Sequence, residues 1–523
     1  MTSVESERLG SAGGGGVRAT DLTGDASADF SEVARMSDAL SADYLEHHAL
    51  LPLRRVGERI VAATWIDRVD PQALDDLALL FDARIEIVRA PEHDLRTAIR
   101  RIYSDDPVTA QQMIEGMTGE VRRADDQDIP LDDLLHLANE APVVKLVNLL
   151  LLEALESRAS DVHLEGYEDG LRVRYRIDGV LQDAPSPPPH LTPAIISRLK
   201  IMAELDIAER RLPQDGRIRL RLQNRQVDVR VSTLPTLRGE SVVLRLLDKE
   251  RGRIGLAELG MAPDTMQQFT EAISRPHGIV LSTGPTGSGK TTTLYAAVDL
   301  IRTGREKILT VEDPVEYQLP GVPQVPVNEK VGVTFATALR ALLRQDPDVM
   351  LVGEIRDAET AEIATQAALT GHLVLSTLHT NDAATALTRL LDLDVAPYLV
   401  ASTVDAVLAQ RLVRVICRSC KTSMRVEPSL LRGLDRSAAG LVEAWRGTGC
   451  DDCRGTGYRG RTGVYELLVM DDELRSELLN RRGSGELRQI AISKGMRTLQ
   501  GDGIRLVRAG VTTLEEVLRV TRA

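Results

Sequence analysis

Residues 282–294 read STGPTGSGKTTTL, and this stretch decides the fold of the chain around it. Its core, GPTGSGKT at 284–291, fits the pattern G-x-x-x-x-G-K-[ST], in which a glycine-rich loop cradles phosphate groups. The apolar run GIVLST precedes the loop, and TTTLYAAVDLI follows it with the spacing of a helix. Strand, loop and helix in this order predict a P-loop nucleotide-binding site; an ordinary glycine-rich turn is the alternative.

The motif also assigns roles along the loop. Backbone N–H groups of Gly287, Ser288 and Gly289 can close on the phosphates, and the helix N-terminus adds partial positive charge. We expect Lys290 to reach the β- and γ-phosphates of ATP and the Thr291 hydroxyl to bind Mg²⁺. The expected nucleotide-contacting residues are Gly284, Pro285, Thr286, Gly287, Ser288, Gly289, Lys290, Thr291 and Thr292.

Carboxylates follow two further apolar runs. QDPDVMLVGEIRD at 345–357 places Glu354 just past a strand, and Gly353 stands where the common P-loop pattern has Asp. Metal binding must therefore depend on Glu354 and a second carboxylate. LTVEDPVEY at 309–317 offers Glu312, Asp313 and Glu316, each of which could instead be a solvated loop charge.

Two histidines, His372 and His379, flank the apolar run 373–378. A lone histidine is usually structural. Because both stand at the ends of a strand in the nucleotide core, we expect them to sense the γ-phosphate.

The chain of 523 residues is long enough for three or four domains. Residues 1–30 are rich in Gly, Ser, Asp and Ala and predict a disordered tail; 31–104 predict a small α+β domain in which Asp70 caps a helix. A polar linker at 105–140 follows, then an α+β domain at 141–250 with arginines on its strands. From 251 to 523, β-branched runs alternate with helices, which predicts a parallel α/β fold.

Composition excludes some functions. The formal net charge is −13 and aromatic residues make up 3%, which argues against a nucleic-acid partner. No apolar run reaches the length of a membrane-spanning helix, and the N-terminus does not resemble a signal peptide. We therefore expect a cytoplasmic protein whose membrane role comes through partners.

All four cysteines stand in two C-x-x-C pairs, at Cys417 and Cys420 and at Cys450 and Cys453. Four thiolates of this kind suit a closed tetrahedral Zn²⁺ site, with disulfides as the alternative. The pairs predict a structural zinc module at about 411–465.

Four boxes in one order carry a resemblance: GPTGSGKTTT, ILTVEDPVEY, LRQDPDVMLVGEIRDAET and TGHLVLSTLHTND. They resemble the Walker A, Asp, Walker B and His boxes of secretion ATPases, hexameric motors of type II secretion, type IV pili and their relatives. The resemblance extends over about 31–523. It implies a RecA-like motor domain after a PAS-like α+β domain, and a homohexamer that hydrolyses ATP.

The resemblance also implies that Arg217 and Arg230 reach the phosphates, although the residues alone read as strand-surface charges. Arg340, Arg344 and Arg356 match family positions near subunit contacts and the active site. The expected catalytic set is Glu354, Glu312, His379, Arg217 and Arg230.

The cysteine pairs and the single N-terminal domain favour a motor of type II secretion, with a type IV pilus extension ATPase as the nearest alternative. The resemblance implies two partners: the cytoplasmic domain of the type II secretion membrane protein L, and the inner-membrane platform protein F. We therefore expect the chain peripherally at the inner membrane. A nucleic-acid translocase and a scaffold with a vestigial P-loop are alternatives of other classes; the charge balance opposes the first, and intact Lys290, Thr291 and Glu354 oppose the second.

Overall fold

The computed structural model describes residues 33, 35–37, 40, 42–57, 59–66, 69–103, 110, 111, 114, 138, 141–168, 170–222, 225–248, 254–426 and 438–521. The tail predicted at 1–30 and nearly all of the linker predicted at 105–140 lie outside these residues. Contacts divide the chain into two units, one of 1–123, 144–153 and 185–190, the other of 124–143, 154–184 and 191–523.

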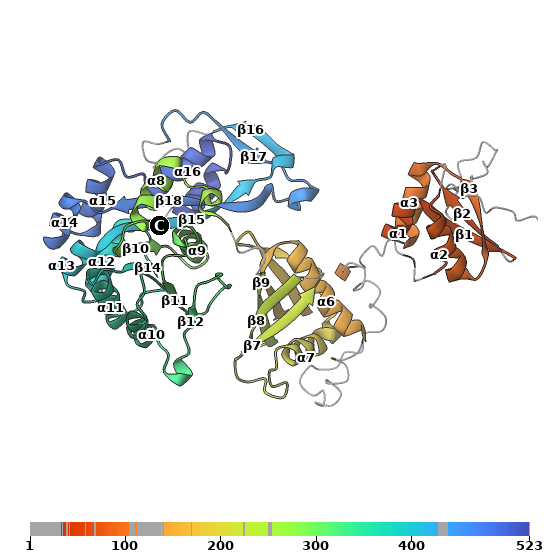
Figure 1. Ribbon diagram of the computed structural model, residues 1–523, viewed down its shortest axis with the longest axis horizontal. Helices are drawn as coiled ribbons and strands as arrows, with labels where there is room; N and C mark the ends of the chain where they lie inside the picture. Colours follow the sequence, from red (N-terminus) through yellow and green to blue (C-terminus); the bar gives the residue numbers. More distant parts are fainter. Residues whose placement is uncertain are drawn as a thin grey trace, which may run out of the picture. The chain divides into compact units, whose positions relative to one another are not determined.

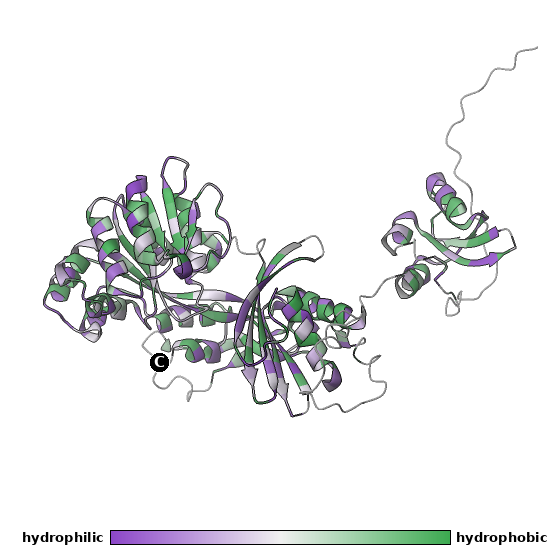
Figure 2. Cartoon of the chain, turned by 90° about the horizontal axis from the view of Figure 1, so that it is seen from below, coloured by the Kyte–Doolittle hydropathy of each residue, from purple (hydrophilic) through white to green (hydrophobic). Residues whose placement is uncertain are grey.

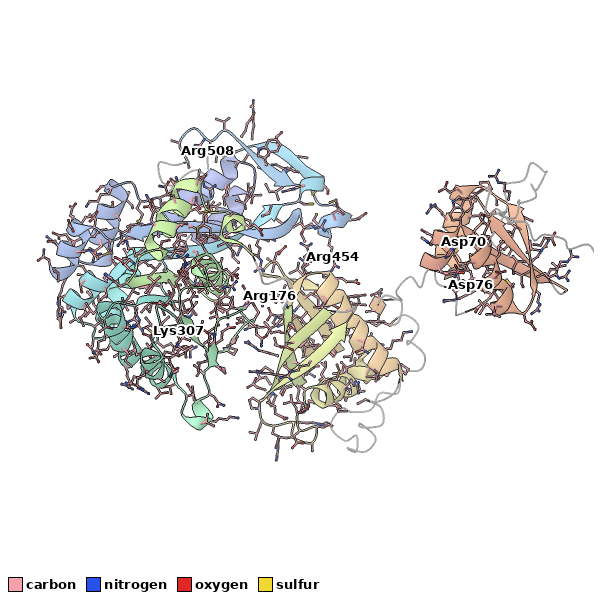
Figure 3. All side chains as sticks on the ribbon, in the orientation of Figure 1. Asp70, Asp76, Arg176, Lys307, Arg454 and Arg508 are labelled. Atoms are coloured by element: carbon pink, nitrogen blue, oxygen red, sulfur yellow. The ribbon has the colours of Figure 1, made fainter. Side chains whose placement is uncertain are left out.

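The small N-terminal domain is a three-stranded sheet with three helices (Figure 1, red and orange). Its elements are α1 (Ala42–His48), β1 (Leu50–Val56), β2 (Arg59–Thr64), α2 (Pro71–Phe81), β3 (Arg84–Arg89) and α3 (Glu92–Tyr103). Asp70 caps α2 as predicted, since its side chain accepts a hydrogen bond from the Gln72 N–H at 3.0 Å, and Pro71 takes the first helical position. Asp70 and Asp76 both belong to this domain (Figure 3).

A six-stranded antiparallel sheet forms the next domain, in the order β6-β5-β4-β9-β8-β7. Its elements are α6 (Ala141–Glu156), β4 (Ala159–Tyr167), β5 (Gly170–Ile177), β6 (Val180–Asp183), α7 (Thr192–Met202), β7 (Gln214–Leu222), β8 (Arg225–Thr236) and β9 (Gly239–Asp248). In the sequence Leu171, Val173, Tyr175 and Ile177 alternate with polar residues, which predicts one buried face of a strand; on β5 the first three are buried and Ile177 is partly exposed. Its C-terminal boundary stays a prediction, because 249–253 lie outside the described residues.

The third domain contains a seven-stranded sheet in the order β12-β11-β13-β14-β10-β15-β18. Its strands are β10 (Gly278–Thr283), β11 (Ile308–Glu312), β12 (Gln324–Pro326), β13 (Val349–Val352), β14 (Leu373–Leu378), β15 (Val404–Ile416) and β18 (Tyr458–Val469). The four apolar runs of the sequence form β10, β11, β13 and β14, and all of them run parallel. The expected parallel α/β fold is confirmed, with β18 added as an antiparallel edge strand.

Helices cover both faces of this sheet, because successive side chains along a strand point into two different cores. On β10, Ile279 and Leu281 pack in one core with α10 to α15, whereas Val280 packs in the other with α8 and α9. The helices are α8 (Pro263–Ile273), α9 (Lys290–Ile301), α10 (Phe335–Leu342), α11 (Ala358–Leu369), α12 (Ala383–Asp392), α13 (Pro397–Thr403), α14 (Asp472–Leu479), α15 (Ser484–Ser493), α16 (Leu499–Arg508) and α17 (Leu514–Thr521). Figure 2 shows that hydrophobic (green) and hydrophilic (purple) residues both occur along the helices. A hairpin of β16 (Lys421–Arg425) and β17 (Glu443–Gly447) completes the domain.

Candidate functional site

The P-loop lies between β10 and α9 and depends on its glycines. Gly287 and Gly289 have φ angles of 78° and 91°, a left-handed conformation that side chains disfavour. Gly284 has a φ of 151°, and a Cβ there would lie 2.6 Å from the Gln410 carbonyl oxygen. Only glycine therefore fits at 284, where the chain turns away from the sheet past β15.

Lys290 is the first residue of α9 and is 9% exposed. Its Nζ donates to the carbonyl oxygens of Gly284 at 2.8 Å and Pro285 at 3.2 Å. Burial lowers the pKa of Lys290 to about 8; Glu354 opposes that change and Arg411 adds to it. The ammonium is thus held beneath the loop, and no carboxylate among the described residues pairs with it directly.

Two hydroxyls complete the loop. Ser288 Oγ is buried and has no hydrogen-bond partner among the described residues, while Thr291 is exposed at the start of α9. An orphaned donor, a buried ammonium and a helix N-terminus together fit an anionic phosphate group, and an exposed hydroxyl beside them fits a bound Mg²⁺.

Glu354 follows β13 and is fixed from two sides. Its Oε2 lies 3.1 Å from His379 Nε2, and its Oε1 pairs with Arg356. Its side chain is only 12% exposed. The backbone is crowded at Gly353: a Cβ there would lie 3.3 Å from the Glu312 Cα, the Val311 carbonyl oxygen and a ring carbon of Phe335. A side chain at this position, such as the Asp of the common pattern, would require these neighbours to shift by a few tenths of an ångström.

The two histidines lie at opposite ends of β14. Because β14 runs parallel to β10, with Leu378 beside Thr283, His379 lies at the P-loop end of the sheet. His372 lies at the other end, where its carbonyl accepts from the Gly278 N–H and its Nδ1 lies 2.9 Å from the Ala367 carbonyl oxygen. The prediction of phosphate sensing is therefore wrong for His372, which has a structural position.

Glu312 ends β11 and is 3% exposed. Its carboxylate accepts hydrogen bonds from Tyr295 Oη, Thr310 Oγ1 and Gln324 Nε2. These bonds tie the strand to α9 and to β12. None of these three hydrogen-bond partners is a P-loop residue, and the catalytic role of Glu312 stays a prediction.

Arg217 on β7 and Arg230 on β8 are direct cross-strand partners, so both side chains leave the same face of the hairpin. They line a cavity of about 1120 Å³ together with Arg245 and the segment 313–327. Arg230 Nη2 lies 3.4 Å from Glu316 Oε2, and burial lowers the pKa of Arg230. The P-loop residues, all of them described, do not line this cavity.

The remaining arginines of the family pattern contact other groups. Arg356 pairs with Glu354, whereas Arg340 pairs with Glu359 and Arg344 donates to the Arg340 carbonyl oxygen. Of the three, Arg356 alone contacts one of the expected catalytic residues.

Two residues of β15 were missed as site residues. Gln410 Nε2 donates to the Ser288 carbonyl oxygen at 2.8 Å, and Arg411 Nη2 donates to the Asn381 carbonyl oxygen at 2.9 Å. The signal for these two residues is the adjacent polar pair Gln-Arg between the apolar pairs Leu408–Ala409 and Leu412–Val413.

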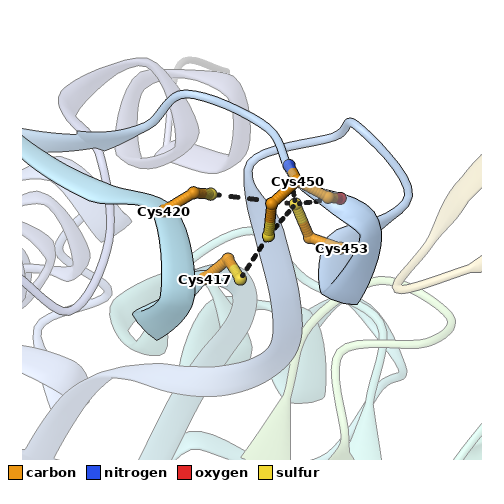
Figure 4. A group of neighbouring side chains, drawn as sticks. All are labelled: Cys417, Cys420, Cys450 and Cys453. Carbon is orange, nitrogen blue, oxygen red and sulfur yellow. Dashed lines mark hydrogen bonds between the residues drawn. The ribbon is translucent and has the colours of Figure 1, made fainter. Parts of the chain in front are cut away.

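The four cysteines converge on one point (Figure 4). Sulfur–sulfur distances are 3.8 Å for Cys417–Cys450, 3.8 Å for Cys420–Cys453 and 3.7 Å for Cys450–Cys453. Ligands about 2.3 Å from a tetrahedral Zn²⁺ lie about 3.8 Å apart, whereas disulfide sulfurs lie about 2.05 Å apart. The cysteines are free, and the geometry fits zinc.

Backbone amides support this cluster. Cys453 Sγ accepts from the N–H groups of Cys450 and Gly457, both at 3.2 Å. Although burial opposes ionisation, these two bonds lower the pKa of Cys453 to about 7. The surrounding glycines permit this close approach, since Gly447 and Gly457 lie too near each other for a Cβ on either residue. Arg454, which follows the last cysteine, is labelled in Figure 3.

The helices in the described ranges are all too short or too polar to cross a bilayer.

Comparison with known proteins identifies relatives over most of the chain. Residues 136–519 match the family model of the type II/IV secretion system protein, and residues 26–109 match the MshEN domain. Type II secretion system protein E of Pseudomonas aeruginosa is 49% identical over 459 residues, which cover 87% of this chain and 91% of that protein. The type IV pilus assembly ATPase PilB of Myxococcus xanthus is 44% identical over 494 residues, or 94% of this chain and 87% of that one.

Among solved structures, the Legionella pneumophila ATPase DotB superimposes with a TM-score of 0.54 at 21% identity. The superposition covers 76% of this chain and 98% of that one. This likeness supports the fold.

Proposed function

Because this chain belongs to the type II/IV secretion system protein family, we propose that it powers a type II secretion system as a Mg²⁺-dependent motor of six identical subunits. The chain is an ATP-hydrolysing enzyme, and in this proposal the hydrolysis drives pseudopilus assembly and protein export. The supporting observation is the arrangement at the carboxyl ends of parallel strands: Lys290 under the loop, and Glu354 held by His379 and Arg356.

The chain's own residues divide the work of phosphoryl transfer. The P-loop glycines and Lys290 bind the phosphates, and the His379 and Arg356 contacts keep the Glu354 carboxylate in place at the end of its strand. Mg²⁺, held by Thr291 and Glu354, would neutralise charge on the phosphates. Arg217 and Arg230 would complete the site from the second domain, so that hydrolysis depends on movement of that domain.

Zinc has a structural role in this proposal. The four cysteines leave no ligand position open for a substrate, and they tie the chain after β15 to the chain before β18. A site closed in this way stabilises the fold and supplies no chemistry.

The N-terminal domain is the proposed membrane link. It has its own core, formed by residues such as Leu50, Leu77 and Ile99, and it contains none of the four boxes. We assign it to docking on the cytoplasmic domain of membrane protein L, while the motor acts on platform protein F. The protein would then work in the cytoplasm, peripherally at the inner membrane.

A type IV pilus extension ATPase is the second candidate, and its support is the 44% identity to PilB over nearly the whole chain. Deletion of the gene in its source bacterium separates the two. Loss of protein export with pili intact supports type II secretion, and loss of surface pili with export intact contradicts it. Tight, salt-sensitive binding of DNA to the purified chain would instead favour a nucleic-acid translocase.

A further inference from the structure

β15 continues beyond the strand that leads into the P-loop. It pairs in parallel with β10, and Thr283, the last residue of β10, lies beside Ala409. The next two residues of β15, Gln410 and Arg411, therefore flank the loop where it leaves the sheet. Both are buried, at 1% and 9% exposure.

Gln410 uses both ends of its amide. Its Nε2 donates to the Ser288 carbonyl oxygen at 2.8 Å, and its Oε1 accepts from Ser282 Oγ at 3.2 Å. The side chain thus ties the middle of the P-loop to the strand that precedes it.

Arg411 connects the P-loop to the loop after β14. Its Nη2 donates to Asn381 at the carbonyl oxygen (2.9 Å) and at Oδ1 (3.3 Å), and its Nη1 donates to the Gln410 carbonyl oxygen at 3.0 Å. A Cβ on Gly284 would lie 3.1 Å from the same Nη1. The guanidinium therefore lies between the start of the P-loop and a residue two positions after His379.

The charge of Arg411 has no direct counter-ion. In the part of the chain that the structure describes, no carboxylate oxygen lies within 4.0 Å of its nitrogens, although Glu466 and Asp382 act on it from farther away. Burial lowers the pKa of Arg411, and Arg411 in turn lowers the pKa of Lys290. Two buried cations that no described carboxylate pairs with directly are unfavourable, and phosphate binding relieves that cost.

We propose that Arg411 is a positioning residue for ATP hydrolysis: it holds the loop that carries His379 against the P-loop, and its buried charge strengthens the binding of nucleoside di- and triphosphates. The inference rests on ATP hydrolysis at this P-loop and not on which secretion machine the chain serves.

The test uses Arg411→Met, Arg411→Lys and the control Arg414→Met in the full-length protein. Arg414 lies on the same strand, but its guanidinium pairs with Glu516 at 2.7 Å. We expect Arg411→Met to weaken ADP binding about tenfold or more, because a buried positive charge is lost. Arg411→Lys keeps the charge and should bind ADP within about threefold of wild type, yet lower kcat about tenfold because an ammonium cannot reproduce the planar fork to Asn381. Arg414→Met should lower the melting temperature with ADP affinity unchanged.

The split between kcat and ADP affinity separates this role from a structural one. A structural defect would lower both quantities together, whereas Arg411→Lys should lose kcat and keep its ADP affinity. ADP binding within twofold of wild type in Arg411→Met overturns the charge role. If Arg411→Met does not fold, Arg411→Lys decides, and a wild-type kcat there overturns the positioning role.

Discussion

His379 Nε2 lies 3.1 Å from Oε2 of Glu354, across the ends of two neighbouring strands. β13 and β14 pair in parallel, with Val352 beside Ser376, so the residues just beyond them emerge at the same edge of the sheet. With Arg356 on the other carboxylate oxygen, both oxygens of Glu354 have a partner that holds the carboxylate in place.

This arrangement predicts that Glu354→Gln separates binding from turnover. The amide keeps the size of the side chain but loses the charge needed for metal and water, so we expect kcat to fall at least about 100-fold. Calorimetry should show ADP affinity within a few-fold of wild type.

Lys290→Ala is the matched comparison, because it deletes the ammonium beneath the loop. It should remove most ATP affinity as well as turnover. Near-wild-type hydrolysis by Glu354→Gln would mean that Glu354 has neither role.

The sulfur geometry predicts about one Zn²⁺ per chain in purified, reduced protein, measured by elemental analysis. Cys450→Ser removes one of four ligands and should lower both the zinc content and the melting temperature. Ser419→Ala is the control, since Ser419 lies between the ligands in the sequence but its hydroxyl donates to the exposed Asp452 side chain. Fully folded protein without zinc would contradict the site.

The nucleotide core can be predicted from the sequence because each of its strands and its P-loop is encoded by a short local pattern. A glycine-rich loop between an apolar run and a helical run has few alternatives, and GIVLST, KILTVE and HLVLSTL each form the expected strand. The parallel direction of these strands could also have been inferred from the sequence. In a parallel sheet, a residue before a strand lies opposite the P-loop, and this rule would have excluded His372.

Other features depend on distant partners that no local pattern shows. β15 contains Arg411, which is buried, and Arg414, whose side chain is 19% exposed. Their partners come from Asn381 and from Glu516 near the C-terminus. Glu312 stands at a strand end, as predicted, but its burial depends on Tyr295 and Gln324. Such residues are recognised only when the fold brings their partners together.

Glu516 on α17 predicts a pH-dependent part of the stability. Burial alone would raise its pKa, but hydrogen bonds from Arg519 and Arg414 outweigh burial and lower the pKa from 4.5 to about 2. A carboxyl group whose pKa is lowered by folding stabilises the protein above pH 4.5, and that contribution is lost as the pH falls toward 2. Glu516→Gln should therefore reduce the free energy of unfolding by about 2–3 kcal/mol at pH 7.

Denaturant titrations of Glu516→Gln and wild type at pH 7 and at pH 3 measure this difference, which should shrink at the lower pH. Glu515→Gln is the control, because that neighbour is exposed. An equal loss of stability at both pH values would show that Glu516 acts through packing alone.

The proposed docking role predicts that deletion of 1–104 leaves nucleotide binding intact but moves the protein from the membrane fraction to the cytosol. The deleted part contains the independent core of the N-terminal domain and no residue of the P-loop or the other boxes. Full-length Lys290→Ala is the control and should stay with the membrane, since recruitment does not need hydrolysis. If the truncated protein is still found in the membrane fraction of a strain that expresses the receptor, another part of the chain recruits it.

The last prediction concerns the β7–β8 hairpin, which carries Arg217 and Arg230, and how the energy of ATP hydrolysis is used. Arg217 and Arg230 face the cavity beside segment 313–327, and Arg230 pairs there with Glu316. If hydrolysis requires these charges to reach the phosphates, it requires the second domain to move. Loss of such an arginine costs about 10³-fold or more in other P-loop enzymes. We expect Arg217→Ala and Arg230→Ala each to cut steady-state ATPase activity at least tenfold, with little change in melting temperature.

Arg245→Ala is the matched control for this pair. Arg245 lines the same cavity, but its Nε lies 3.1 Å from Asp161 Oδ1 and its side chain is 55% exposed, so its loss should leave turnover unchanged. A role as strand-surface charge predicts full activity in all three variants. Because Arg217 and Arg230 lie side by side, one could replace the other, and the double variant removes that possibility. Unaltered hydrolysis in Arg217→Ala, Arg230→Ala would contradict a motor that works by closing one domain on the other.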